Sequence, residues 1–455
     1  MCKVYKKLIH GSKITSPNGR IDFEQWLSSF IDDNKMLLSF TNEDTNDTIL
    51  DTCQHSLQLW EILLNLTGGA VELKKCFITI LQYNESYKWY SHQPGVPRLI
   101  RSKENGKQCI ITRDGDKGTV IRQQDITKGV RLLGVNAAAN GTFEQEFLTR
   151  LEKSRELAGR LQAAPLNIAL SWQVYYCRWK PAITYCLPIT TFSATECKRI
   201  QSPFYAALLP KLGINRHMPR ALLHGPQQVA GLGLINLEAE QLAMHVTGMV
   251  AQLRKNDRVG QTMHASIDAL QIYLGIKEHF FTQIAGDLEH RPSRRESQLV
   301  YIWEELNSID CSLLIDNFWT PKSRGKNDVA LLEAIIQIRN KRRGTSNHLP
   351  KTAIWYVNAC RLYLRVTMLN EICTPCGKYI EAWALNGTKR NDKTNLTYPY
   401  QRKPPPHVWK VWRDSILAAF LTSREQGRPT LHIPLDIETI EENIPPWRNR
   451  IMRGM

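Results

Sequence analysis

The hydrophobic pattern of the chain changes near Phe143, and this change limits the fold more than any other feature of the sequence. Before Phe143, short apolar runs between turn residues predict strands, together with one long amphipathic helix. From Phe143 onward, apolar residues recur at helical spacing in one segment after another. The first third is therefore expected to be mixed α and β, and the remainder mostly α. Besides the helix that starts at Phe143, the expected later helices cover residues 195–209, 234–254, 263–274, 296–306, 329–339 and 354–370.

Two adjacent aspartates lie between short apolar runs near the start of the chain. Residues 26–31 and 35–40 predict two strands, and Asp32-Asp33-Asn34 between them favours a tight turn. A helix is expected next, because seven apolar residues from Ile49 to Leu64 share one face, with Asp47 as its N-cap. Gly68-Gly69 is expected to end this helix in a left-handed conformation. The pattern predicts a small antiparallel sheet covered by a helix.

The order of these segments resembles the second half of the reverse-transcriptase palm of retrotransposons. In that family an aromatic residue, one further residue and two aspartates form a hairpin, and Phe30-Ile31-Asp32-Asp33 matches this pattern. The next helix and glycine turn resemble the block that delivers a lysine to the incoming nucleotide, here Lys75, with Lys74 as second choice. Leu133-Gly134 resembles the stretch between palm and thumb. Later matches are Pro181, Tyr185 and Gly231-Leu232-Gly233-Leu234, preceded by Ala230 where the family usually has glycine.

The resemblance implies an α+β fold, in which a partial polymerase palm (a small antiparallel sheet with a helix) precedes a mainly α thumb-like and C-terminal region. The implied boundaries are 1–135 for the palm, 136–290 for the thumb-like region and 291–455 for the C-terminal region. It also implies RNA-directed DNA synthesis on an RNA or DNA template-primer. Asp32 and Asp33 would hold Mg²⁺, which prefers carboxylate and phosphate oxygens, and Lys75 would offset charge near the triphosphate.

The family also needs an aspartate on an earlier palm strand, for which the sequence offers no match. Only 31 residues precede Asp32, and Asp22 lies too close to the hairpin to be the opposing ligand. The chain is therefore expected to be truncated and catalytically incomplete alone, with Mg²⁺ bound only if a missing palm and fingers portion completes the site. The alternative interpretation is a solvated turn at Asp32 and Asp33, and a solvated strand end at Lys74 and Lys75.

The net charge favours a polyanionic partner. Lys and Arg number 59 against 43 Asp and Glu, a formal charge of +16, which favours nucleic acid over a membrane. Lys198-Arg199 and Lys341-Arg342-Arg343 are the candidate phosphate contacts. No run approaches the roughly 18 apolar residues of a membrane span. Two alternatives to a polymerase-related protein stay open: a non-catalytic basic nucleic-acid-binding protein and an unrelated helical scaffold.

Cysteine usage and the N-terminus favour an intracellular protein, cytoplasmic or nuclear. The 11 cysteines are scattered and odd in number, which fits free thiols, and the N-terminus lacks the apolar core of a secretory signal. Cys373 and Cys376 form the only C-x-x-C pair, without a second ligand pair at zinc-finger spacing. Trp60, Trp172 and Trp179 lie on helical faces and are expected in the core.

Overall fold

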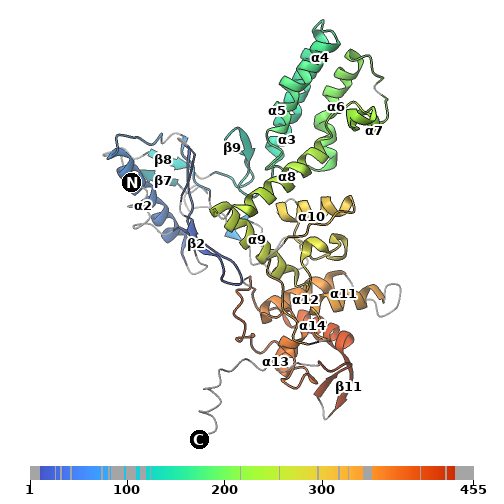
Figure 1. The fold of residues 1–455 in the computed structure, drawn as a ribbon. Coiled ribbons are helices and arrows are strands. Elements are labelled where there is room, and N and C mark those ends of the chain that lie inside the picture. The colour runs from blue at the N-terminus through green and yellow to red at the C-terminus, as the bar shows by residue number, and fades with distance from the viewer. Residues whose placement is uncertain are drawn as a thin grey trace, which may run out of the picture. The chain divides into compact units, whose positions relative to one another are not determined.

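The structure is a computed structural model of the 455-residue chain, and it combines α-helices with two-stranded antiparallel sheets (Figure 1). This mixture agrees with the expectation of an α and β chain. Two compact units are found: Met1–Ser86 with Ser91–Ser266 and Arg291–Leu313, and Tyr87–Tyr90 with Ile267–His290 and Leu314–Met455. The structure describes residues 11–25, 27–30, 33–40, 44–72, 75–79, 82–83, 97–98, 109–112, 119–122, 124–215, 217–255, 257–294, 297–315, 318–325, 327–341, 351–399, 401–425 and 428–435.

The strands of the first unit are short and all lie before residue 143. They are β1 (Ser12–Thr15), β2 (Asp22–Gln25), β3 (Leu27–Phe30), β4 (Asp33–Met36), β5 (Gln82–Tyr83), β6 (Pro97–Arg98), β7 (Cys109–Thr112), β8 (Thr119–Arg122), β9 (Val130–Leu132) and β10 (Val135–Ala137). Each pairs with its neighbour in sequence as an antiparallel hairpin.

The helices begin at residue 46 and occupy most of the chain after residue 143. They are α2 (Asn46–Asn65), α3 (Glu144–Ala163), α4 (Ile168–Val174), the π-helix η2 (Tyr175–Trp179), α5 (Lys180–Thr184), α6 (Ala194–Lys211), α7 (Arg220–His224), α8 (Leu237–Arg254), α9 (Arg258–Leu274) and α10 (Gln298–Ser308). The second unit adds α11 (Leu331–Lys341), α12 (Lys351–Leu364), α13 (Ala382–Asn386), α14 (Pro406–Phe420), β11 (Leu421–Glu425) and β12 (Arg428–Leu431). Single 3₁₀ turns are η3 (Gln227–Val229), η4 (Phe280–Thr282), η5 (Ala285–Asp287) and η6 (Leu369–Ile372).

The predicted hairpin around the paired aspartates is present, but its turn is displaced. Strands β3 and β4 pair with Phe30 opposite Asp33, so Asp33 starts the second strand instead of lying inside the turn. Helix α2 lies against this hairpin, because its buried Trp60 packs against Leu27 and Met36. This local packing of a helix on two antiparallel strands is the arrangement that the sequence predicts, and α2 also contacts β7.

The ends of α2 show one wrong prediction and one that is confirmed. The N-cap is Thr45, whose side chain accepts a hydrogen bond from the Thr48 amide, so Asp47 lies inside the first turn instead of capping it. A carboxylate there still favours the helix through its dipole. At the other end Gly68 has a φ of +80° and its amide donates to the Asn65 carbonyl, which is the expected left-handed ending.

Three helical segments after Phe143 form a bundle in the first unit (Figure 1). Helices α3 and α6 run in the same direction: Phe147 near the start of α3 meets Phe192 just before α6, with ring centroids 6.3 Å apart. At their other ends, Lys211 Nζ donates to the Ala164 carbonyl at 2.7 Å. The segment α4–η2–α5 connects them and returns between these two ends. Its π-helical turn precedes Pro181, which has no amide proton for an i−4 hydrogen bond.

The aromatic side chains of the bundle are stacked in its core. Trp179 and Tyr175 are fully buried, and Trp179 stacks on Phe204 at 4.9 Å. The indole of Trp179 donates to Ser154 Oγ at 3.0 Å. Trp60 and Trp179 are thus core residues, as the helical spacing predicts, whereas Trp172 is only partly buried.

The second unit has its own core, and a buried arginine lies inside it. Arg361 on α12 donates to the carbonyls of Ile272 at 2.6 Å and Tyr273 at 2.8 Å. Helix α12 ends at Leu364, earlier than predicted, because Arg365 adopts a left-handed φ of 59°. The predicted single helix over 354–370 is therefore wrong, and a separate 3₁₀ turn occupies residues 369–372.

Candidate nucleic-acid interface

The bundle segment, defined as residues 157–237, carries a large excess of positive charge. It has eight basic residues and one acidic residue, Glu196. Glu196 is held in the capping box at the start of α6, where its Oε2 accepts hydrogen bonds from the Ser193 amide at 2.8 Å and hydroxyl at 2.7 Å. The basic residues are Arg160, Arg178, Lys180, Lys198, Arg199, Lys211, Arg216 and Arg220.

Besides Arg160, four of these cations are exposed on the helices: Arg178, Lys198, Arg199 and Arg220. Within the described part of the chain, none of the four forms an ion pair. The Arg199 guanidinium lies 4.9 Å from the centroid of the Phe147 ring, so a cation–π contact orients it while it stays exposed. Arg160 differs, because Glu156 pairs with it at 2.5 Å. The exposed cations can therefore contact phosphates without first losing a partner.

An exposed aromatic pair lies on the same returning segment. Tyr176 is 44% exposed and stacks on Trp172, with ring centroids 5.6 Å apart and planes inclined by 22°. Arg178 follows two residues later. Helical spacing alone assigned Trp172 to the core, and the structure instead places it partly at the surface beside Tyr176.

A polar junction fixes the β9–β10 hairpin to the base of the bundle. The buried carboxylate of Glu146 accepts hydrogen bonds from the amide and the side chain of Asn136, at 2.7 and 2.8 Å. Arg150 pairs with Glu146 and donates to the carbonyls of Ala182 at 2.6 Å and Gly134 at 3.2 Å. These contacts give the basic helices a rigid base.

Gln241 binds the loop before α6 to the helices α8 and α10. Its Nε2 donates to the Phe192 carbonyl at 2.9 Å and to the Tyr301 hydroxyl at 2.7 Å. Its Oε1 accepts from the Phe192 amide at 3.1 Å and from the Thr190 hydroxyl at 3.2 Å. All four hydrogen-bonding positions of this buried amide are used, so the network positions the start of α6.

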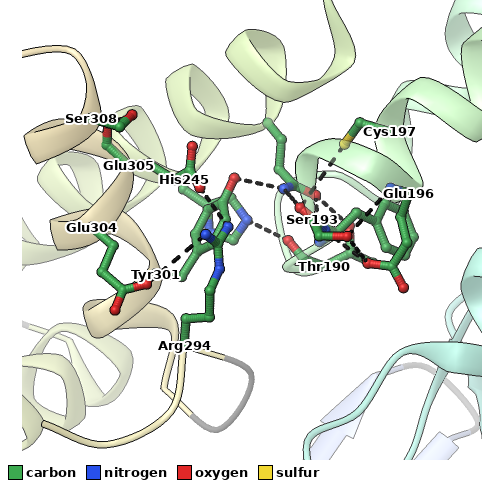
Figure 2. A network of polar contacts seen from close by, with 12 residues as sticks. Thr190, Ser193, Glu196, Cys197, His245, Arg294, Tyr301, Glu304, Glu305 and Ser308 are labelled. Carbon is green, nitrogen blue, oxygen red and sulfur yellow. Dashed lines mark hydrogen bonds and ion pairs between the residues drawn. The ribbon is translucent and has the colours of Figure 1, made fainter.

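His245 and Arg294 extend the same network (Figure 2). His245 Nε2 contacts the Thr190 carbonyl at 2.6 Å and its Nδ1 contacts Gln298 at 2.5 Å. Burial lowers the pKa of His245, because desolvation disfavours the imidazolium. The Arg294 guanidinium lies 4.9 Å over the Tyr301 ring and pairs with Glu305. Every group here has a structural partner, so we interpret the network as support for the bundle.

The predicted catalytic residues are not brought together among the described side chains. Asp32 lies outside the described residues, and only the backbone of Asp33 is described, at the start of β4. Lys75 is exposed, and its amide donates to the Glu72 carbonyl at 3.0 Å. Val71, four residues earlier, packs beside Trp60. Lys74 is outside the described residues.

The two predicted basic clusters have different outcomes. Lys198 and Arg199 are exposed on α6, as a phosphate-binding role requires. Lys341 is the last residue of α11 with its side chain undescribed, and Arg342 and Arg343 lie outside the described residues. The eight-to-one charge ratio of the bundle segment is visible in the sequence, but it is spread over 81 residues and so does not stand out as a cluster.

Neither a metal site nor a membrane span is found among the described residues. Among the described residues, no group of three or more His, Cys, Asp and Glu side chains could hold a metal ion. Cys373 lies just before, and Cys376 inside, a turn closed by the Thr374 amide on the Tyr379 carbonyl, and among the described residues no third metal ligand joins them there. No helix in the described ranges has the length and apolar character needed to cross a membrane. No family model, curated protein or solved structure matches the chain.

Proposed function

We propose that this chain binds nucleic acid through the bundle segment and is a retroelement-derived, reverse-transcriptase-like protein. The observation that carries the binding proposal is the charge of residues 157–237. This segment has eight basic residues and one acidic residue, and that carboxylate is held in a helix cap. A thumb grips primer-template duplex mainly through its phosphates, which calls for exposed cations on a helical surface and for no base-specific contacts.

The reverse-transcriptase part of the proposal is supported by the order of the sequence motifs and by the local packing of α2 on the β3–β4 hairpin. Magnesium is not needed for the binding that we propose. We derive no catalytic step through Mg²⁺, because Asp32 and the Asp33 side chain lie outside the described residues and no other described group could hold a metal ion.

Binding of the full chain to a labelled RNA–DNA hybrid duplex at increasing salt tests the proposal. We expect micromolar affinity at physiological salt and a steep loss of affinity as salt rises. The variant Arg178→Glu/Lys198→Glu should weaken binding at least about tenfold and lower the salt slope by about 2, because two phosphate contacts are lost.

The matched control is Arg254→Glu/Lys255→Glu, which makes the same charge change at exposed residues outside the bundle segment. It should weaken duplex binding far less. Equal losses for the two variants would mean that only the net charge matters. A flat salt response, or no binding at low salt, would favour the alternative of a helical scaffold.

A further inference from the structure

A second surface of strong positive charge lies in the second unit, within residues 386–413, which we name the C-terminal basic surface. This stretch has seven basic residues and a single acidic one, Asp392. The basic residues are Lys389, Arg390, Lys393, Arg402, Lys403, Lys410 and Arg413. None of them belongs to the clusters that the sequence analysis selected.

Hydrogen bonds and close packing bring the separate parts of this stretch side by side. Arg390 Nη2 donates to the Gln401 carbonyl at 3.2 Å, which joins the loop after α13 to the segment before α14. Trp412 on α14 donates from its indole to the Ala384 carbonyl of α13 at 2.9 Å. Gly387, with a φ of +61°, lies against Trp409 of α14, where a Cβ atom would be only 2.3 Å from the indole. The seven cations therefore share one region of the unit.

Four of the lysines are exposed and available: Lys389, Lys393, Lys403 and Lys410. In the part of the chain that the structure describes, none of the four makes an ion pair. Nucleic-acid phosphates can therefore contact these lysines without breaking an existing salt bridge.

Half-buried aromatic rings lie among these cations. Lys389 Nζ is 5.8 Å from the centroid of Trp383, and the Arg390 guanidinium is 4.7 Å from that of Tyr363. His407 is exposed at the start of α14. Base stacking on aromatic rings beside phosphate-binding cations is the usual way in which proteins hold single strands, whose bases are free. A duplex offers only phosphates and groove edges to such a surface.

We propose that the C-terminal basic surface binds single-stranded nucleic acid, as a site separate from the duplex-binding bundle segment. It contacts the phosphates through Lys389, Lys393, Lys403 and Lys410, and the bases lie near Trp383 and His407. Lys389, Lys393 and Lys403 lie in irregular chain between α13 and α14, and Lys410 lies on α14, an arrangement that suits a flexible strand better than a straight duplex.

The test measures binding of the full chain to a labelled single strand of oligothymidine and to a duplex of equal length. Lys403→Glu/Lys410→Glu is compared with Lys322→Glu/Arg324→Glu, which makes the same charge change at exposed residues outside the stretch. We expect the first variant to bind the single strand at least about tenfold more weakly, with a salt slope lower by about 1.4, and the control to change it much less.

Several outcomes would overturn this proposal. One is an equal loss of single-strand affinity in both variants, and another is a loss of affinity in Lys403→Glu/Lys410→Glu that is confined to the duplex. A third is displacement of the labelled single strand by polyglutamate as efficiently as by unlabelled oligothymidine. If the double Glu variant unfolds, Lys403→Gln/Lys410→Gln removes the same contacts with a smaller charge change, and an unchanged affinity would overturn the proposal equally.

The result is separable from the proposed function of the bundle. Arg178→Glu/Lys198→Glu should weaken duplex binding while single-strand binding is retained through the C-terminal basic surface. If that variant weakens neither ligand while Lys403→Glu/Lys410→Glu weakens the single strand, the bundle proposal fails and this one stands.

Discussion

The hydroxyl of Tyr185 donates a hydrogen bond of 2.7 Å to the carbonyl of Leu133, 52 residues earlier in the chain. Leu133 and Gly134 form the two-residue turn between β9 and β10, with φ angles of 49° and 85°. The ring of Tyr185 lies over Gly134, where a Cβ atom would be 3.3 Å from the ring. Two sequence motifs that were identified independently thus meet at the base of the bundle.

The first prediction is that Tyr185→Phe destabilises the protein slightly. The lost hydrogen bond is exposed, so we expect a decrease of about 0.5–1 kcal/mol in the free energy of unfolding, measured by urea denaturation. Tyr176→Phe removes a hydroxyl from another exposed tyrosine and is the matched control, with a change near zero. A larger loss at Tyr176 than at Tyr185 would contradict the role given to the Tyr185 contact.

The second prediction concerns Ala230, which adopts a left-handed φ of 63° before the Gly231-Leu232-Gly233-Leu234 stretch. Because a Cβ atom is unfavourable there, we expect Ala230→Gly to stabilise the protein by about 0.5–1 kcal/mol. The same substitution at exposed Ala243, inside α8, should destabilise by about 1 kcal/mol. Thermal unfolding of both variants gives the comparison, and effects of the same sign would refute the backbone argument.

The third prediction is a pH dependence that arises from His279. This ring stacks between Phe280 and Phe318, and burial lowers its pKa to about 4. The unfolded state therefore binds more protons than the folded state, so His279 lowers stability as pH falls from about 6.5 to about 4 and adds nothing further below that.

His279→Phe keeps the ring packing and removes the titration, so its stability relative to the parent chain should rise on acidification across this window. Urea unfolding midpoints at several pH values measure this difference. A parallel pH profile for His279→Phe and the parent chain would show that His279 is not the source.

The fourth prediction is that Arg361→Met severely destabilises the second unit. The side chain is fully buried, and burial lowers its pKa to about 10, still well above neutral pH. It also donates to the Val366 carbonyl and the hydroxyl of Thr367, at 3.2 and 3.1 Å. Losing these donors leaves buried carbonyls unpaired, which costs about 3–5 kcal/mol. Exposed Lys410→Met should change stability by less than about 0.5 kcal/mol, and a similar small change at Arg361 would disprove its structural role.

Local elements were predictable because they depend on neighbouring residues. Apolar spacing predicted α3, α6, α8 and α10 to within a few residues, and alternation with turn residues predicted the β3–β4 hairpin. The effects of single residues were harder to predict. The sequence does not reveal that Thr45 caps α2 in place of Asp47, or that Arg365 adopts a left-handed backbone conformation that ends α12.

The contacts of the candidate site were beyond local prediction, because they join residues far apart in sequence. Gln241 reaches Phe192 across 49 residues, and Arg361 reaches Ile272 across 89. No spacing rule connects such pairs. The charge of residues 157–237 needed no structure, but the structure was needed to show that Glu196 is held in a cap and that Lys198 is exposed.

The contact between Arg361 and the carbonyls of Ile272 and Tyr273 has a consequence for protein synthesis. Residues 267–290 belong to the second unit, whereas residues 291–313, which follow them in the chain, belong to the first unit. During synthesis on a ribosome, residues 267–290 emerge long before Arg361. The carbonyls of Ile272 and Tyr273 therefore lack this hydrogen-bond donor until Arg361 has been translated. Because both units are discontinuous in sequence, dividing the gene at one position cannot separate them as complete units. Expression of the N-terminal or C-terminal half alone is therefore expected to yield an aggregation-prone polypeptide.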